Sequence, residues 1–290
     1  MEGSKPQKRE KPEQVASPFM PMFETFRKEL DEHHDRRERI IKASRDITAA
    51  SKKIIFTLQR VRKLGQAVPP FVTKGNGQYW EIIEKQYQSI AADVQGLNAY
   101  RYGNNITGGN QEFMEALSFQ HYLETQTLVS YEEAQSRVAT MSGAAGAVPL
   151  SSEDYILGIF DMVGELMRFS ITTMATNGEL PAGPVKKAEQ EKADSDADNM
   201  DIDEQAPETG GAEGGRNVLS DLRALRLQLE MFEPAGGRFE KDVRKKAWVM
   251  RECVDKVEKA WYGLTVRGTE RPKGWVPDVR EERREEIQGY

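Results

Sequence analysis

The sequence has few of the residues that form cross-links or bind soft metals. It contains one cysteine, Cys253, and three histidines among 290 residues. A single cysteine excludes a disulfide framework within the chain and a cage of cysteine ligands around zinc. No zinc-ligand spacing, glycine-rich phosphate loop or serine nucleophile elbow is present either. Enzyme classes built on those motifs are therefore not expected.

Long apolar runs are also missing. No stretch is long enough to cross a bilayer, and no charged-then-apolar leader opens the chain. Hydrophobic residues still make up 38% of the sequence, which is enough for a core. Charged residues make up 30%, a fraction typical of long amphipathic helices. We expect a soluble, intracellular protein with one large domain or two small ones.

The net charge of −6 is unevenly distributed along the chain. Residues 184–215 contain ten acidic side chains against three lysines, which gives this segment −7 and leaves the remainder at +1. The segment has almost no large apolar residues, so burial cannot offset the entropy lost on ordering. We predict a disordered acidic insertion there, a disordered tail at 1–17 and a C-terminal tail at 269–290. The near-neutral remainder does not exclude a polyanionic partner.

Helical periodicity dominates the rest of the chain. Apolar residues between Phe23 and Val61 recur at helical spacing, with acid-before-base pairs four residues apart. A helix of about 45 residues would be roughly 65 Å long and would need long neighbours. Glycines and prolines from Gly65 to Gly77 are predicted to break the chain.

Five more helices follow in the predicted order. Their approximate ranges are 80–97, 110–127, 153–176, 222–232 and 243–264. Neither Asn-Gly pair lies between two alternating strand runs, so no hairpin is expected. The predicted fold class is all-α, a long-helix bundle spanning 18–268 and interrupted by the acidic insertion.

The helix at 153–176 is apolar on nearly every side, which is typical of a buried helix. Asp161, Glu165 and Arg168 nevertheless share one narrow stripe on it, with Asp154 two turns earlier. Buried like charges are costly unless a cation meets them. One explanation is that Arg168 and nearby lysines neutralise these acids.

A second carboxylate pair lies on the preceding helix, where Glu112 and Glu115 are three residues apart on one face. Two helices that each direct a carboxylate pair inward could form an oxygen-rich site for a divalent cation such as Mg²⁺. Such an ion can activate water and stabilise charge on a phosphodiester. Di-iron chemistry would need Glu-x-x-His pairs, and no histidine here has a glutamate three residues before it. Spacing alone leaves both the ion-pair and the metal-site explanations open.

Four sequence blocks form a specific combination. They are FETFRKEL at 23–30 with SRDIT at 44–48 and IF at 55–56; ITG at 106–108 with QEFMEALSFQH at 111–121; DYILG at 154–158 with GELMR at 164–168; and KVE at 256–258 with VRG at 266–268. Together they closely resemble the translin family, in its translin-associated factor X (Trax) branch. The resemblance covers most of 23–178 and 238–272.

The resemblance implies a translin-type helical fold that assembles with translin into a closed hetero-oligomeric shell. It also implies Mg²⁺-dependent endonucleolytic cleavage of single-stranded RNA or RNA fragments, including passenger-strand fragments in Argonaute-linked silencing and transfer-RNA precursor fragments. The family's acidic cluster falls on Glu112, Glu115, Asp161 and Glu165. Glu115 and Glu165 are expected to ligate Mg²⁺ most directly. Glu112 and Asp161 would complete its shell or orient the attacking water as general bases.

Cations that could face RNA are harder to identify. A basic run at the end of the first helix supplies Lys52, Lys53, Arg60, Arg62 and Lys63, although a solvated face explains this run equally well. A weak basic cluster near the N-terminus leaves nuclear entry open, so the expected location is the cytoplasm. The alternative function is a non-catalytic, nucleic-acid-binding or scaffold subunit that stabilises translin. The presence of all four acids favours the catalytic interpretation.

Overall fold

The computed structural model describes residues 17–184, 216–234 and 236–267. The tails and acidic insertion predicted from the sequence lie outside these residues, apart from Ser17 and Pro184 at their borders. Over the described residues the regular structure is helical, and the pairing of extended backbone is limited to one bridge between Ala182 and Asn217. The predicted all-α class is confirmed.

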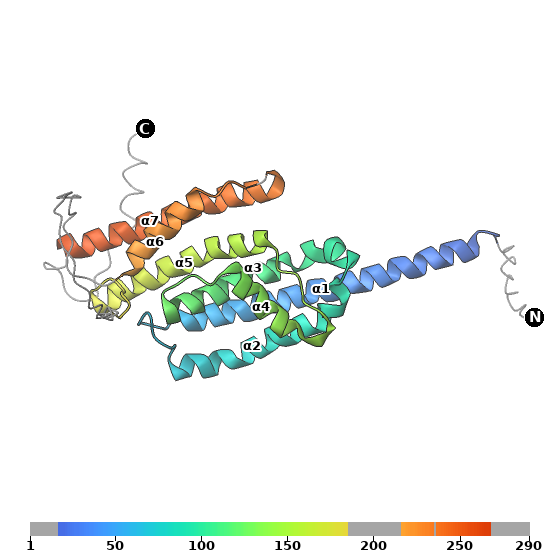
Figure 1. Ribbon diagram of the computed structural model, residues 1–290, viewed down its shortest axis with the longest axis horizontal. Coiled ribbons are helices and arrows are strands. Elements are labelled where there is room, and N and C mark those ends of the chain that lie inside the picture. Colours follow the sequence, from blue (N-terminus) through green and yellow to red (C-terminus); the bar gives the residue numbers. More distant parts are fainter. Residues whose placement is uncertain (1–16, 185–215, 235, 268–290) are drawn as a thin grey trace, which may run out of the picture.

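Three long helices lie side by side at the centre of the molecule (Figure 1). α1, α3 and α5 form this central layer, α2 packs against α1, and α7 packs against α5. Two shorter helices cover the outer ones, α4 on α2 and α6 on α7. The elements are α1 (Met20–Leu58), α2 (Pro70–Ile90), η1 (Ala91–Val94), α3 (Leu97–Thr125), α4 (Tyr131–Ser142), η2 (Gly143–Ala145), α5 (Ser152–Asn177), α6 (Val218–Glu230) and α7 (Gly237–Arg267). Among the described helices, none combines the length and the apolar character that crossing a membrane requires.

Two helices begin earlier than predicted because glycines within them were interpreted as breaks. α2 begins at Pro70, since proline suits the first helical position, and continues through Gly75 and Gly77. α3 begins at Leu97 and continues through Gly109. A Cβ on Gly109 would lie 3.0 Å from the Cα of Ser44, so this glycine allows α1 and α3 to approach closely.

The sequence interpretation missed α4 and placed the end of α1 too late. α4 begins with a capping box, in which Ser130 accepts from the Glu133 N–H at 3.2 Å and the Glu133 carboxylate accepts from the Ser130 N–H at 2.9 Å. The Ser-x-x-Glu motif was therefore the available signal. α1 ends at Leu58, so the last three residues of the predicted basic run lie in the following loop.

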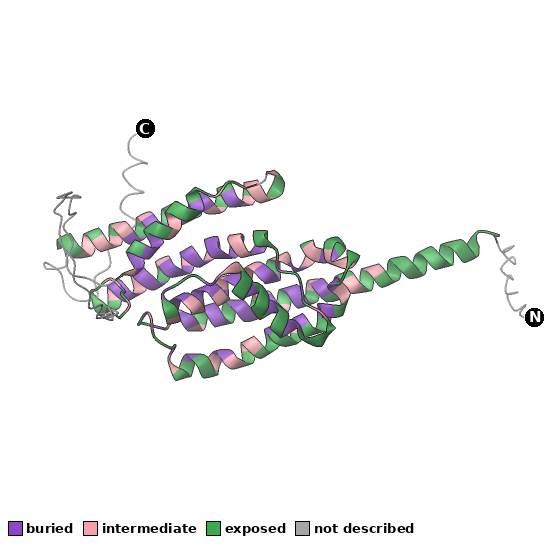
Figure 2. Cartoon of the chain, viewed as in Figure 1, coloured by how far each residue is buried: buried purple, intermediate pink, exposed green. Residues whose placement is uncertain are grey.

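The N-terminal half of α1 extends beyond the bundle (Figure 1), and its surface is exposed (Figure 2). Burial on this helix begins at Ile40. Before that point Phe23, Phe26 and Leu30 are 60%, 49% and 67% exposed. The projecting half therefore carries apolar side chains that nothing in the described chain covers.

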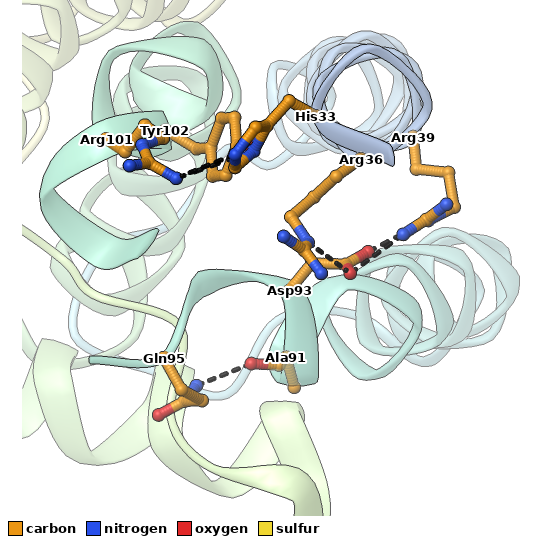
Figure 3. A network of polar contacts seen from close by, with 8 residues as sticks. All are labelled: His33, Arg36, Arg39, Ala91, Asp93, Gln95, Arg101 and Tyr102. Carbon is orange, nitrogen blue, oxygen red and sulfur yellow. Dashed lines mark hydrogen bonds and ion pairs between the residues drawn. The ribbon is translucent and has the colours of Figure 1, made fainter. Parts of the chain in front are cut away.

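A polar network fastens α1 where it enters the bundle (Figure 3). Asp93 of η1 accepts two hydrogen bonds from Arg39, at 2.9 and 2.8 Å, and one from Arg36 at 3.2 Å. These bonds, chiefly those from Arg39, hold the pKa of Asp93 below its usual value. Beside them, His33 contacts the Tyr102 hydroxyl and lies 3.1 Å from Arg101 Nη1.

Candidate active site

A cleft of about 510 Å³ lies where α1, α3 and α5 meet. Its lining consists of Lys52, Ile55 and Phe56 from α1, Glu112 and Glu115 from α3, and Asp161, Glu165 and Arg168 from α5. The fold therefore brings together all four carboxylates that the sequence analysis selected from two separate helices.

Gly158 sets the separation of the two acid-bearing helices. A Cβ at this position of α5 would lie 2.5 Å from the Cβ of Met114 and 3.0 Å from the carbonyl oxygen of Gln111 on α3. Those two residues flank Glu112 and precede Glu115. The missing side chain thus allows α3 and α5 to approach closely within one or two turns of all four acids.

Two of the acids are ion-paired with lysines from other helices. Both carboxylate oxygens of Asp161 accept from Lys246 Nζ of α7. Glu112 Oε1 lies 3.2 Å from Lys52 Nζ of α1. The ion-pair explanation, which the sequence offered for the acids of α5, is therefore correct for Asp161, and it is also correct for Glu165, which lies 3.1 Å from Arg168 Nη1.

Glu165 is the most deeply buried of the four, with 8% of its surface exposed. Its Oε2 accepts from Gln59 Nε2 at 2.6 Å and from Arg168 Nη1 at 3.1 Å. Gln59 Nε2 also lies 3.0 Å from the Glu165 carbonyl oxygen. Gln59 and Arg168 therefore fix the orientation of this carboxylate.

Glu115 is different, because its carboxylate has no hydrogen bond or ion pair with any residue that the structure describes. Burial raises its pKa to about 8, and the charges of Asp161, Glu112 and Glu165 add to the effect in that order. Lys246 opposes the rise. Negative charge therefore outweighs positive charge around the Glu115 carboxylate.

The donor set fits Mg²⁺ in type, while the present side-chain positions do not form a finished site. Over the described chain, no three Asp, Glu, His or Cys side chains converge closely enough to hold a metal ion. Asp161 is engaged by Lys246, and Glu165 by Gln59 and Arg168. Four carboxylates around one cleft are nevertheless the oxygen ligands that Mg²⁺ prefers. A bound cation would also relieve the repulsion that raises the pKa of Glu115.

Asp154, on the same stripe of α5, has a structural role outside the cleft. It is buried and accepts from Asn110 Nδ2 and Gln111 Nε2, both at 3.2 Å. These bonds tie the start of α5 to α3.

The predicted RNA-binding cations do not gather at the cleft. Only Lys52 lines it among the five, which also include Lys53, Arg60, Arg62 and Lys63. Lys53 lies 5.3 Å from the ring centre of Tyr79, and Arg60 lies 5.0 Å from that of Phe71. Arg62 donates to backbone carbonyls. Lys53, Arg60 and Arg62 are thus in contact with neighbouring groups of the same chain rather than directed into the cleft.

Sequence reasoning did not identify Gln59, Lys246 or Phe56 as site residues. Gln59 and Glu165 are 106 residues apart, and Lys246 and Asp161 are 85 apart. No local pattern encodes contacts of that separation. A signal was available for Phe56. It is an apolar residue that lies outside the apolar stripe already assigned to its helix, although its neighbour Ile55 is buried.

Comparison with known proteins gives a consistent result. The translin family profile matches residues 35–268. Translin-associated protein X from Mus musculus is 30% identical over 283 residues, covering 91% of this chain and 84% of the mouse protein. The Schizosaccharomyces pombe homologue of translin-associated protein X is 34% identical over 150 residues, or 52% of this chain and 61% of the yeast protein.

Solved structures agree at the level of the fold. Apo-NeC3PO superimposes with a TM-score of 0.52 and 16% identity, covering 84% of this chain and 98% of that one. A complex of AfC3PO with duplex RNA gives a TM-score of 0.53, again with 16% identity, covering 86% of this chain and 100% of that one. The sequence matches decide the relationship: this chain belongs to the translin family.

Proposed function

We propose that this chain is the catalytic subunit of an endoribonuclease complex with translin, and that it hydrolyses RNA phosphodiesters with Mg²⁺. The observation that carries the proposal is that Glu112, Glu115, Asp161 and Glu165 all line one cleft. The name of the mouse relative supports a translin partner, and the AfC3PO–RNA complex supports RNA as the ligand of this fold. Passenger-strand fragments in Argonaute-linked silencing and transfer-RNA precursor fragments are the proposed substrates, and the cytoplasm is the proposed location.

Each of the four acids has a role in this proposal. Glu115 and Glu165 would hold Mg²⁺, while Glu112 and Asp161 would complete its shell or orient the attacking water. When bound, the ion supplies Lewis acidity and neutralises charge on the phosphodiester. Gln59 and Arg168 keep the Glu165 carboxylate in position.

Exposed apolar residues support dependence on a partner. Beyond the projecting half of α1, Trp248 and Tyr262 on α7 are 62% and 69% exposed. Large exposed apolar side chains are typical of surfaces that become covered on assembly. The isolated chain is therefore expected to aggregate, and co-expression with translin to keep it soluble.

The test is to co-express the chain with translin and to assay cleavage of single-stranded RNA with Mg²⁺ and with EDTA. Glu115→Gln and Glu165→Gln keep the size of the side chain but remove its charge. Each should lower the rate by orders of magnitude while RNA binding survives, and the double variant should be barely worse. Glu153→Gln, at an exposed position of α5, is the matched control. Assembled Glu115→Gln and Glu165→Gln complexes that cut RNA at the wild-type rate would contradict the proposal.

A second candidate function is a non-catalytic RNA-binding or scaffold subunit that stabilises translin. The observation in its favour is that Asp161, Glu112 and Glu165 already have cationic partners in this chain. If these acids serve only as ion-pair partners, Glu165→Gln should destabilise the complex and leave any cleavage unchanged. The same two variants thus separate the candidates.

A further inference from the structure

Phe56 is an exposed aromatic side chain at the candidate active site. It lines the cleft, yet 76% of its surface is exposed. Its neighbour Ile55 is 6% exposed and belongs to the core, whereas Phe56 does not pack against that core. Within the described part of the chain, no other ring and no cation stacks on the phenyl group. Packing inside this chain therefore does not account for Phe56.

Around Phe56 the cationic side chains are more exposed than the carboxylates. Lys52 lies one helical turn earlier on α1 and so shares its face, and Arg168 lines the cleft from α5. The side chains of Lys52 and Arg168 are 62% and 63% exposed, whereas those of Glu112 and Glu165 are 25% and 11% exposed. The cleft thus has an acidic floor and a rim that carries two cations and one phenyl ring.

We propose that Phe56 is a stacking platform that holds one base of a single-stranded RNA beside the carboxylates of the cleft. The inference rests on the proposed function and adds a positioning residue to it. The face of a phenyl ring stacks on any base, and an unpaired base is free to reach it. Lys52 and Arg168 are paired with Glu112 and Glu165, and their remaining N–H donors can contact backbone phosphates next to that base.

A nucleic acid fits this surface better than a protein partner does. The cores of protein interfaces are depleted in charged residues. Phe56 instead shares its cleft with Lys52, Arg168 and four carboxylates. Cations interleaved with an exposed ring are the usual composition of a single-strand binding surface.

The experiment uses the complex with translin and compares Phe56→Ala, Phe56→Trp and a control, Tyr100→Ala. Tyr100 is 94% exposed and lies twelve residues before Glu112 on α3, roughly 18 Å along the helix. Binding is measured in a Glu115→Gln background, so that it does not depend on hydrolysis. The probe is a single-stranded RNA that carries 2-aminopurine, whose fluorescence is quenched by stacking.

Phe56→Ala should assemble normally, weaken RNA binding roughly 5- to 100-fold and restore the fluorescence, because stacking on a ring contributes about that much per base. Phe56→Trp should preserve binding and quenching, and Tyr100→Ala should change neither. With Glu115 intact, Phe56→Ala should raise KM more than it lowers kcat.

Equal RNA binding by Phe56→Ala and Tyr100→Ala would overturn the inference, as would failure of Phe56→Ala to assemble with translin. Neither result would affect the proposed function, which is tested separately by the loss of cleavage in Glu115→Gln and Glu165→Gln. Conversely, Phe56-dependent quenching in a complex that never cuts RNA would support the stacking role and refute the catalytic one.

Discussion

Lys246 of α7 is ion-paired with both carboxylate oxygens of Asp161 on α5, so the candidate Mg²⁺ site contains its own cationic competitor. Lys246 also limits the rise in the pKa of Glu115. A divalent ion that recruits Asp161 must displace this ammonium group. The strength of metal binding should therefore depend on a residue that does not itself bind the metal.

Lys246→Met should strengthen Mg²⁺ binding, because it removes the competing cation and leaves the cleft more negative. The rise in Tm on adding Mg²⁺ to the translin complex should be larger in this variant than in the wild type. Lys245→Met, at an exposed neighbouring position, should behave like the wild type. An unchanged or smaller Mg²⁺-induced rise in Lys246→Met would show that Asp161 does not take part in metal binding.

Glu115→Gln should stabilise the metal-free complex at high pH. The pKa of Glu115 is about 8 in the folded protein against an ordinary 4.5, so the folded state binds the proton more tightly than the unfolded state. The wild type therefore loses stability as pH rises from 4.5 to 8. Glutamine does not titrate. Since one pKa unit is about 1.4 kcal/mol, half of the shift alone gives the variant an advantage of roughly 2 kcal/mol at high pH.

Denaturant unfolding in EDTA at pH 5 and pH 8.5 measures this difference. The wild type and Glu115→Gln should be nearly equal at the lower pH and clearly separated at the higher one. A constant difference at both values would mean that the carboxylate is ionised throughout.

Gly158→Ala should destabilise the protein by about 1–3 kcal/mol, because the new methyl group overlaps Met114 on α3. Separating α3 from α5 also moves Glu112 and Glu115 away from Asp161 and Glu165, so cleavage should fall roughly tenfold or more. Gly164→Ala is the control on the same helix, with no atom within 4 Å of its added Cβ. It should stabilise by up to about 1 kcal/mol, the usual gain for this change within a helix. Thermal unfolding that showed the two variants to be alike would refute the close approach.

Asp93→Asn should cost about 1 kcal/mol at pH 7, because it removes the carboxylate that joins Arg36 and Arg39 to η1. The pKa of Asp93 lies below its ordinary 3.8, so its contribution is present above that value and is lost as pH falls further. The difference between variant and wild type should therefore narrow in acid. Asp31→Asn, at a pair whose side chains are 84% and 71% exposed, is the control and should change nothing. A difference that persisted unchanged at pH 2 would show that the charge of Asp93 is not responsible.

The sequence predicted the features of the fold that depend on local periodicity. α5 was recognised as buried because apolar residues surround its axis, and it spans Ser152–Asn177 against a prediction of 153–176. The starts of α2 and α3 were missed because Gly75 and Gly109 were interpreted as breaks. Gly109 in fact occupies a helix crossing, where an added Cβ would lie 3.0 Å from the backbone of Ser44. A glycine at a crossing and a glycine at a break look alike in one sequence.

In the candidate site, too, the features that depend on local spacing could be predicted and those that depend on long-range contacts could not. Glu112 and Glu115, and likewise Asp161 and Glu165, could be selected because pairs at helical spacing share a face. The partners of these acids could not be predicted, since Lys246 and Gln59 reach the cleft only through contacts across the folded chain. For the basic run, the sequence suggested RNA-binding cations, but Lys53 and Arg60 lie over the rings of Tyr79 and Phe71 on α2. Nothing in the sequence indicated that these rings lie near the run.

The close approach at Gly158 has a consequence for protein engineering. The geometry of the acid cluster depends on the missing Cβ of Gly158, which allows α3 and α5 to approach closely. Copying the four carboxylates alone into another helical scaffold would therefore not reproduce this geometry. A designer would also have to leave one position of the second helix without a side chain and seat it against the backbone beside Met114. Transferring this site therefore requires transferring the glycine position together with the four acids.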